Sequence, residues 1–146
     1  VRVRIIAVGK AKDRSLRELL GDYYARIARY AKFDEVEVKD GDTADVAQRI
    51  AKAIPDRSRV VALEIDGRAL SSRELASWFT RAENDAVQTV VFVIGGAYGL
   101  PADISKAADL RLSLSAMTFP HRLARLVLAE QIYRAFSIQR GEPYDH

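Results

Sequence analysis

The sequence predicts an α/β fold in which a parallel sheet is covered by helices on both faces, and two observations lead to that prediction. Short apolar runs alternate along the chain with segments that have helical spacing. The runs are apolar almost without interruption, as in parallel strands that are buried on both faces. At 146 residues with 49% hydrophobic content, the chain can bury a substantial core, and we expect residues 1–146 to form one domain.

Strands are predicted where an apolar run of strand length ends in turn residues. Runs of this kind occupy residues 3–8, 36–38, 60–65 and 89–94. The second run alternates with charged residues, which indicates an exposed or edge strand. The third is expected to end in a turn at Asp66 and Gly67.

Between these runs the apolar residues follow helical spacing, and each helix has a start signal. The helices are expected at about residues 16–30, 43–53, 72–84 and 121–139. Their start signals are, in the same order, Asp13 or Ser15, Asp42 or Thr43, Ser71 or Ser72, and Pro120. Ser71 and Glu74 have the spacing of a capping box, which strengthens the third start.

The last of these helices is apolar on nearly every side. Its apolar residues are Leu123, Ala124, Leu126, Val127, Leu128, Ala129, Ile132, Tyr133, Ala135, Phe136 and Ile138. A helix with so little polar surface must be covered on more than one side. In a chain of this size, we expect one of those sides to contact a second subunit.

Basic residues gather toward the two ends of the chain. Residues 1–32 contain nine basic residues (Lys or Arg) and three acidic residues (Asp or Glu). Residues 33–105 contain eight basic and thirteen acidic residues, and residues 106–140 contain six basic and two acidic residues. Of the 23 basic residues, 17 are Arg, whose guanidinium group pairs well with phosphate. This distribution favours a polyanionic partner, and the simpler alternative is a basic surface that contacts only water.

Composition excludes several kinds of protein. The chain has no cysteine, so it forms no disulfide framework, thiolate metal site or cysteine nucleophile. No apolar run approaches the roughly 20 residues of a membrane-spanning helix. The first residues alternate as in a strand and lack the pattern of a signal peptide. We therefore expect a cytoplasmic protein without a membrane partner.

The apolar run at 89–94 ends in a loop that contains Gly95, Gly96 and Gly99. Ligands of open parallel sheets bind beyond the carboxyl ends of the strands, and glycine lets a ligand approach the backbone closely. The loop matches neither the dinucleotide-binding nor the phosphate-binding glycine motif. It is either a ligand-binding loop or a strand-ending turn that needs a positive φ.

A second apolar run leads into residues 112–119, with the sequence Leu-Ser-Leu-Ser-Ala-Met-Thr-Phe. Its apolar side chains, hydroxyl groups and backbone groups suit an adenine ring and a thioether better than a triphosphate. It lacks the carboxylates and histidines of a metal site, and we expect no metal. The alternative is an ordinary buried strand and turn.

Three further features are candidates for chemistry. His121 could carry a proton or contact RNA, although a lone His at a helix start is more often structural. Glu130 and Arg134 are spaced i, i+4, which predicts a surface ion pair, or an internal network or active-site fork if the helix is covered. Residues 144–146 combine an aromatic ring, a carboxylate and an imidazole, and are otherwise a frayed tail.

Five stretches of the chain together match one protein family. They are Ile6-Ala7-Val8-Gly9-Lys10, Leu63-Glu64-Ile65-Asp66-Gly67, Phe92-Val93-Ile94-Gly95-Gly96-Ala97-Tyr98-Gly99-Leu100, Leu112-Ser113-Leu114-Ser115-Ala116-Met117-Thr118-Phe119-Pro120-His121-Arg122-Leu123-Ala124-Arg125 and Glu130-Gln131-Ile132-Tyr133-Arg134-Ala135. On these stretches the chain resembles the SPOUT (knotted) methyltransferases, and among them the small bacterial enzymes that methylate N3 of a pseudouridine in large-subunit ribosomal RNA. The resemblance runs essentially from end to end.

The resemblance implies a C-terminal trefoil knot, an exception to the rule that protein chains do not thread. It also implies that S-adenosyl-L-methionine binds in that knot, with no metal. The residues expected to bind this cofactor are Leu63, Gly95, Gly96, Leu114, Ser115, Ala116, Met117, Thr118 and Phe119.

The resemblance further implies a homodimer in which the partner's C-terminal tail completes each active site. The substrate would be a pseudouridine of 23S ribosomal RNA within the ribosome. The expected catalytic residues are Arg134, Tyr144, Asp145 and His146. The family tail usually reads Pro-Tyr-His followed by a basic residue, whereas here Asp145 takes the His position and His146 follows it.

Two other functions fit part of the pattern. A non-catalytic ribosome-binding protein of the same fold would bind no S-adenosylmethionine. An α/β module for another adenine nucleotide would prefer a nucleotide phosphate, and the missing phosphate-binding glycine motif argues against it.

Overall fold

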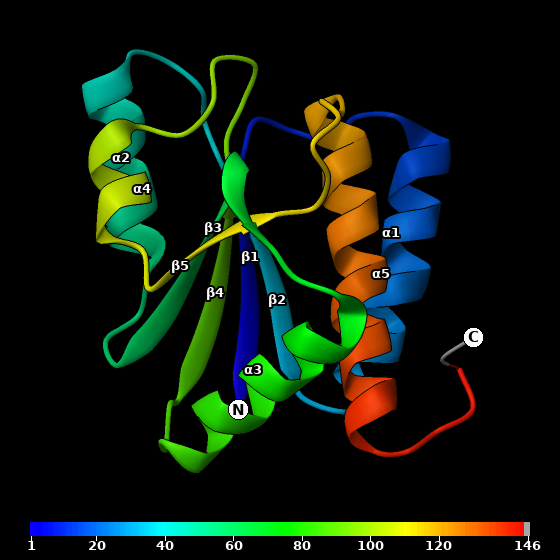
Figure 1. The fold of residues 1–146 in the computed structure, drawn as a ribbon. Coiled ribbons are helices and arrows are strands. Elements are labelled where there is room, and N and C mark those ends of the chain that lie inside the picture. Colours follow the sequence, from blue (N-terminus) through cyan, green and yellow to red (C-terminus); the bar gives the residue numbers. More distant parts are fainter. Residues whose placement is uncertain (145–146) are drawn as a thin grey trace.

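Five parallel strands form the sheet at the centre of the molecule, in the order β2-β1-β4-β3-β5 (Figure 1). The computed structural model describes residues 1–144. The strands are β1 (Arg2–Val8), β2 (Lys32–Val38), β3 (Ser58–Ala69), β4 (Thr89–Ile94) and β5 (Leu110–Ser113). Their pairings are all parallel, which confirms the predicted sheet type.

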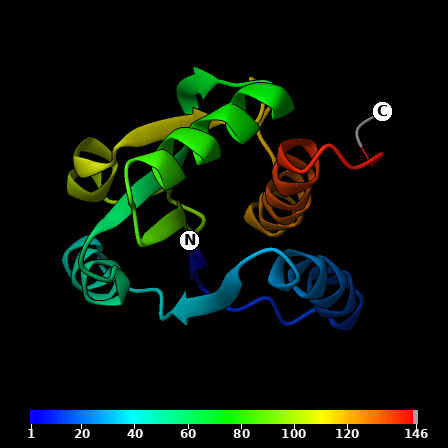
Figure 2. The same cartoon turned by 90° about the horizontal axis from the view of Figure 1, so that it is seen from below.

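Helices cover both faces of this sheet, as predicted. They are α1 (Arg14–Ala28), α2 (Thr43–Ala53), α3 (Ser72–Asn84), α4 (Ala102–Ala107) and α5 (His121–Gln139). Figures 1 and 2 show α2 and α4 on one face and α1, α3 and α5 on the other. Within residues 1–144, no helix combines the length and apolar character needed to cross a membrane.

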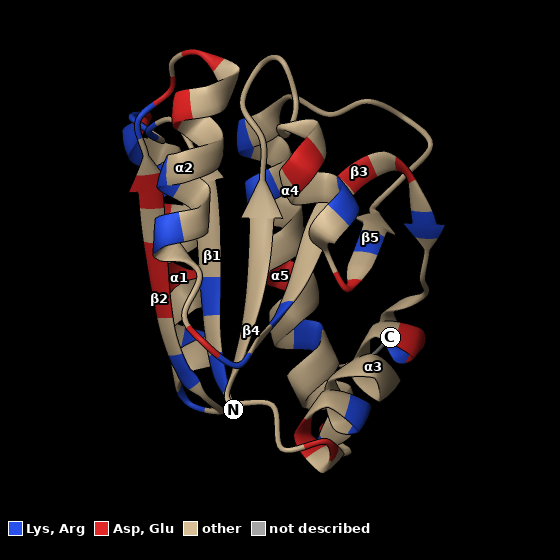
Figure 3. Cartoon of the chain, turned by 90° about the vertical axis from the view of Figure 1, so that its left-hand side faces the viewer, with Lys and Arg blue, Asp and Glu red and all other residues tan. Residues whose placement is uncertain are grey.

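The two faces of β1 explain why a central strand is apolar without interruption. Val3 and Ile5 belong to the core cluster formed with α1, α3 and α5, whereas Ile6 and Val8 pack with residues of α2 on the other face. Figure 3 shows the contrast between β4, which carries no charged residue, and β2, which carries charges along its length. The position of β2 at the edge of the sheet confirms the prediction for that run.

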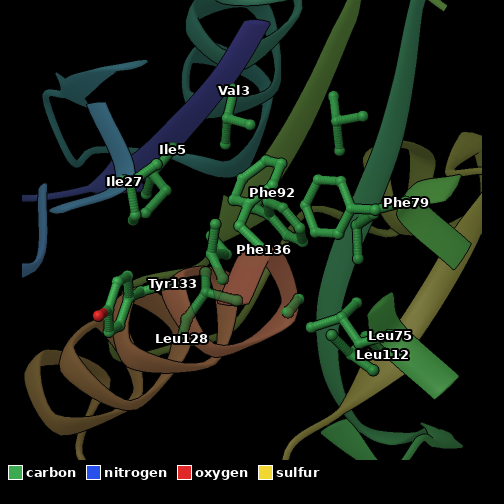
Figure 4. Close-up of a cluster of buried hydrophobic side chains, with 14 of the residues drawn as sticks. Val3, Ile5, Ile27, Leu75, Phe79, Phe92, Leu112, Leu128, Tyr133 and Phe136 are labelled. Atoms are coloured by element: carbon green, nitrogen blue, oxygen red, sulfur yellow. The ribbon is translucent and has the colours of Figure 1, made fainter. Parts of the chain in front are cut away.

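The larger core cluster joins the sheet to α3 and α5 (Figure 4). The ring centroid of Phe79 lies 5.8 Å from that of Phe92 on β4 and 4.9 Å from that of Phe136 on α5. Helix α5 packs against both α1 and α3, which confirms that it is covered on more than one side. Leu123 and Val127 of α5 are nevertheless 47% and 36% exposed.

Side-chain caps determine where the first three helices begin. The carboxylates of Asp13 and Asp42 each accept a hydrogen bond from the backbone N–H three residues further along, at 2.9 Å. Ser71 and Glu74 form both bonds of the predicted capping box. Because each cap is a local contact within one turn, the sequence alone can indicate it.

The predicted end of the third strand is wrong, because β3 continues through Asp66 and Gly67. Strand β5 pairs with β3 up to Leu63 and resumes the pairing at Arg68, so the residues between them form a bulge. A Cβ atom at Gly67 would lie 2.6 Å from the carbonyl oxygen of Arg111. The glycine therefore permits a close approach of two backbones rather than a turn.

Replacing Gly67 with alanine is expected to destabilise the protein by about 2 kcal/mol, because the new methyl group must push β5 away from β3. Gly21→Ala is the matched control. Gly21 lies inside α1 with no neighbouring atom within 4 Å of the added methyl position, so this change should stabilise by up to about 1 kcal/mol. Urea unfolding of the two variants measures both effects. Equal stability of Gly67→Ala and the unsubstituted protein would contradict the close approach.

Candidate active site

A pocket lies beyond the carboxyl ends of β4 and β5 and beside residues 63–65 of β3, at the edge where an open parallel sheet binds its ligands. Its walls come from residues 63–65 in the middle of β3, the glycine-rich loop after β4, the loop after β5 and the first turn of α5. These segments are distant in sequence, and the strand order β4-β3-β5 brings them to one end of the sheet.

The structure places most of the predicted cofactor-binding residues around this one pocket. The lining residues among them are Leu63, Gly95, Gly96, Leu114, Ser115, Met117 and Phe119. Ala116 and Thr118 do not line the pocket, and both are exposed. Cofactor binding by Ala116 and Thr118 stays a prediction. Cofactor binding by the lining residues also stays a prediction.

The pocket also has lining residues that were not among the predicted cofactor-binding residues. They are Glu64, Ile65, Ile94, Gly99, Leu100, Leu112, His121 and Ala124. Most lie within one or two residues of a predicted position, so the strand ends that identified their neighbours could have indicated them as well. His121, which was a candidate proton carrier, lies at the boundary of the pocket on the first turn of α5.

The glycine-rich loop is both a strand-ending turn and a wall of the pocket. The backbone N–H of Gly99 donates to the carbonyl oxygen of Gly96 at 3.0 Å, and Gly99 has a φ of 82°. A Cβ atom at Gly95 would lie 2.4 Å from the carbonyl carbon of Gly99. The two interpretations of the sequence are therefore compatible, because the tight turn is what shapes the wall.

The loop after β5 is shaped by its own hydroxyl groups. Ser113 Oγ donates to the carbonyl oxygen of Ser115 at 3.1 Å, and Ser115 Oγ accepts from the backbone N–H of Met117 at 2.9 Å. Met117 is 75% exposed and Ile65 is 56% exposed, although both line the pocket. Exposed apolar side chains at the rim of a pocket are a surface that a ligand or a partner can bury.

The lining is mostly apolar and carries one carboxylate, that of Glu64. This carboxylate accepts a hydrogen bond from Ser105 Oγ at 2.6 Å and one from Arg111 Nη2 at 3.4 Å. No Lys or Arg belongs to the described residues that line the pocket. Such a pocket suits a ring-containing ligand, and its described lining lacks the cations that a triphosphate needs.

Beside the pocket, a buried arginine ties α5 to the sheet. Arg125 is 1% exposed, and its Nη1 donates to Glu37 at 2.5 Å and to Glu35 at 3.3 Å. Its Nη2 donates to the carbonyl oxygen of Gly9 at 3.3 Å. Glu37 also accepts from the backbone N–H of Ala11 at 2.8 Å. The arginine thus holds the loop between β1 and α1 against α5.

This network lowers the pKa of Glu37 below its ordinary value. Burial alone would raise the pKa of this carboxyl, but the hydrogen bonds from Ala11 and Arg125 outweigh burial. Burial, together with a hydrogen bond to Glu35, raises the pKa of the Tyr24 hydroxyl. The charged residues of β2 therefore include a half-buried face under α1 and α5, which the alternating sequence pattern did not reveal.

The predicted catalytic residues Arg134 and Tyr144 lie together, away from the pocket. Arg134 forms an ion pair with Glu130 at 2.9 Å, and its guanidinium carbon lies 4.6 Å from the ring centroid of Tyr144. The Tyr144 hydroxyl donates to Glu130 at 2.9 Å, and the Tyr144 ring contacts Tyr133 edge-on. Neither Arg134 nor Tyr144 lines the pocket of their own chain.

Two effects raise the pKa of Tyr144 to about 12. The larger effect is burial, and the second is the hydrogen bond to Glu130. The phenol is therefore protonated at neutral pH and acts as a hydrogen-bond donor. The i, i+4 pair of Glu130 and Arg134 is confirmed, and it is half-buried rather than a surface pair. The other two predicted catalytic residues, Asp145 and His146, lie outside the described residues.

A parallel α/β sheet with a glycine-walled, apolar pocket at the carboxyl ends of its strands defines a ligand-binding α/β protein. Residues 1–146 match the family model described as "Predicted SPOUT methyltransferase". The chain belongs to the SPOUT methyltransferase family.

Curated relatives match the chain over its whole length. A protein of Sorangium cellulosum (strain So ce56) named ribosomal RNA large subunit methyltransferase H is 49% identical over 146 residues, which cover 100% of both chains. A protein of the same name from Streptococcus pneumoniae (strain CGSP14) is 38% identical over 157 aligned positions, which cover 99% of each chain.

Solved structures show the same fold at much lower identity. A probable methyltransferase from Bordetella pertussis Tohama I superposes with a TM-score of 0.59 at 14% identity, over 92% of this chain and 95% of that one. A probable methylase family protein from Haemophilus influenzae Rd KW20 gives a TM-score of 0.55 at 14% identity, over 99% of this chain and 70% of that one. At this identity the likeness concerns the fold alone.

Proposed function

We propose that this chain transfers a methyl group from S-adenosyl-L-methionine to N3 of a pseudouridine in 23S ribosomal RNA of the large ribosomal subunit. The observation that carries the proposal is the apolar pocket at the carboxyl ends of β4 and β5, beside residues 63–65 of β3. Two relatives that share 49% and 38% identity along the whole chain are named as methyltransferases of large-subunit ribosomal RNA. A ribosomal substrate would place the protein in the cytoplasm.

The pocket fits the proposed cofactor in shape and charge. Leu63, Leu114 and Phe119 offer apolar surface for the adenine ring, and the loop of Gly95 and Gly96 offers backbone groups. S-adenosylmethionine carries no phosphate, and a pocket without lining Lys or Arg among the described residues accepts it more readily than it accepts a triphosphate. We also propose that the C-terminal part of the chain forms the trefoil knot typical of the family.

When bound, S-adenosylmethionine supplies an electrophilic methyl group, and the residues of this chain position the substrate and manage its charge. Methylation forms a bond from N3 to the methyl carbon, breaks the bond from that carbon to sulfur, and removes the N3 proton. We propose that Asp145, His146 or His121 receives this proton and that Arg134 stabilises negative charge on the base. Tyr144 would stack on a base or position the RNA.

We propose that the active protein is a homodimer in which the tail of one chain completes the site of the other. Two observations support this arrangement. Arg134 and Tyr144 do not line the pocket of their own chain, although the proposed reaction requires them near the substrate. Leu19 of α1 and Leu123 of α5 are each 47% exposed and line one apolar groove, which a second subunit could cover.

Titration calorimetry with S-adenosylmethionine and with ATP tests the pocket assignment. We expect saturable binding of S-adenosylmethionine and no comparable binding of ATP. Leu114→Arg, which places a cation in the pocket, should weaken S-adenosylmethionine binding, whereas Leu19→Arg in the apolar groove should leave the intrinsic affinity unchanged. Absence of S-adenosylmethionine binding would favour a non-catalytic ribosome-binding role, and preference for ATP would favour an adenine-nucleotide module.

A further inference from the structure

A second pocket lies beside the first, and three of its eight lining residues are Lys or Arg. It is formed by the loop between β1 and α1 and by the start of α5, with Lys10, Lys12 and Arg122 among its lining residues. His121 lines both pockets and so forms part of the boundary between them. We refer to the site formed by Lys10, Lys12, His121 and Arg122 as the basic pocket.

The positive charge of the basic pocket is not neutralised by carboxylates of the described chain. Lys10, Lys12 and Arg122 form no ion pair within residues 1–144. Asp13 is the one acidic residue among those that line the pocket, and its carboxylate accepts the hydrogen bond that caps α1. The first turn of α5 has no side-chain cap, so the positive end of a 19-residue helix adds to the same field.

The loop that carries Lys10 and Lys12 is held in place by buried contacts. Arg125 donates to the carbonyl oxygen of Gly9, and Glu37 accepts from the backbone N–H of Ala11, so contacts flank Lys10 on both sides. Arg125 itself is buried in α5, one turn after His121. Because the loop and α5 are joined through the same arginine, the backbone that carries Lys10 keeps a defined position relative to the first pocket.

We propose that the basic pocket binds a backbone phosphate of the RNA substrate next to the target nucleotide. This inference rests on the proposed function. Lys, Arg and helix N-termini are the groups that hold phosphates in RNA complexes, and such contacts position the nucleic acid without reading its sequence. Since the basic pocket and the first pocket share His121, a phosphate bound there would fix the neighbouring base at the mouth of the cofactor pocket.

The test compares two double variants of the full-length protein. Lys10→Ala with Lys12→Ala removes two charges from the basic pocket without changing Arg122, which also borders the apolar groove proposed for the dimer. Lys32→Ala with Lys52→Ala is the matched control. Both control lysines are exposed, and they lie where β2 begins and α2 ends, at the opposite end of the sheet.

Co-sedimentation with ribosomes that lack the methyl group, over a series of salt concentrations, measures binding independently of methyl transfer. We expect the Lys10/Lys12 variant to bind about tenfold more weakly. We also expect the slope of log affinity against log salt to become shallower by about 1, because the loss of one phosphate contact removes close to one unit. The control should retain the affinity of the unsubstituted protein. S-adenosylmethionine binding should be equal in all three proteins.

Two results would overturn the proposal. Equal weakening by both double variants would mean that the lysines contribute only general charge. Loss of S-adenosylmethionine binding in the Lys10/Lys12 variant alone, with ribosome binding unchanged, would assign the basic pocket to the cofactor. Failure of the proposed function is a separate result, since it would appear as absence of methyl transfer by the unsubstituted protein.

Discussion

A chain that ends at Pro143 is expected to keep its affinity for S-adenosylmethionine and to lose methyl transfer by at least about a hundredfold. The deletion removes Tyr144, which does not line the pocket, and the two residues that follow it in the sequence. The contacts of Tyr144 are with Tyr133, Glu130 and Arg134 of α5. Calorimetry and a transfer assay with ribosomes measure the two properties separately. Parallel loss of binding and transfer would contradict a role of the tail in substrate chemistry.

A mixture of two inactive variants shows whether the tail acts on its own chain or on the partner. One variant lacks residues 144–146, and the other carries Leu114→Arg in the pocket. In a mixed dimer, the intact pocket of the first chain meets the intact tail of the second, so we expect methyl transfer to return. If the tail served its own chain, every site in the mixture would lack one component and transfer would stay absent.

Arg125→Met is expected to destabilise the protein by about 3 to 5 kcal/mol, because it leaves two half-buried carboxylates without their buried cation. Arg17→Met is the matched control. Arg17 contacts Glu35 at 2.9 Å and Glu37 at 3.7 Å, but its side chain is 42% exposed, so its loss should cost less than about 1 kcal/mol. Urea unfolding at neutral pH measures both. A similar loss of unfolding free energy in the two variants would mean that burial of the arginine does not determine how much its ion pairs contribute to stability.

The destabilisation by Arg125→Met should shrink in acid. The pKa of Glu37 is lowered in the folded protein, so this carboxyl contributes stability above its ordinary pKa of 4.5 and that contribution is lost as pH falls through the lowered value. In the variant, the hydrogen bond from Arg125 that helps lower this pKa is absent. The difference in free energy of unfolding between the two proteins is therefore expected to be larger at pH 7 than at pH 4. A difference that grows in acid would contradict this assignment.

Features that depend on neighbouring residues could be predicted from the sequence. The caps at Asp13, Asp42 and Ser71 are contacts within one helical turn, and the apolar runs of β1 and β4 reflect burial on two faces. The pocket followed from the same logic, because the ends of parallel strands meet at one edge of the sheet.

Features that depend on distant partners could not be predicted in this way. The pairing of Arg125 with Glu35 and Glu37 joins residues 90 and 88 positions apart, and an arginine in an apolar helix gives no sign of its acceptors. The Asp66-Gly67 dipeptide has the usual signature of a turn, but here the glycine is needed because Arg111 approaches from another strand. The packing of Tyr144 against Glu130 of α5 is likewise a tertiary contact, made by a residue near the end of the chain.

We propose that this chain methylates a pseudouridine of large-subunit ribosomal RNA. A transfer assay tests it most directly, with labelled S-adenosylmethionine, ribosomes from a strain that lacks the protein, and mass mapping of the modified base. We expect one methyl group per large subunit, located at N3 of a single pseudouridine. Transfer to a different RNA or a different base, or no transfer by a protein that binds S-adenosylmethionine, would contradict the account.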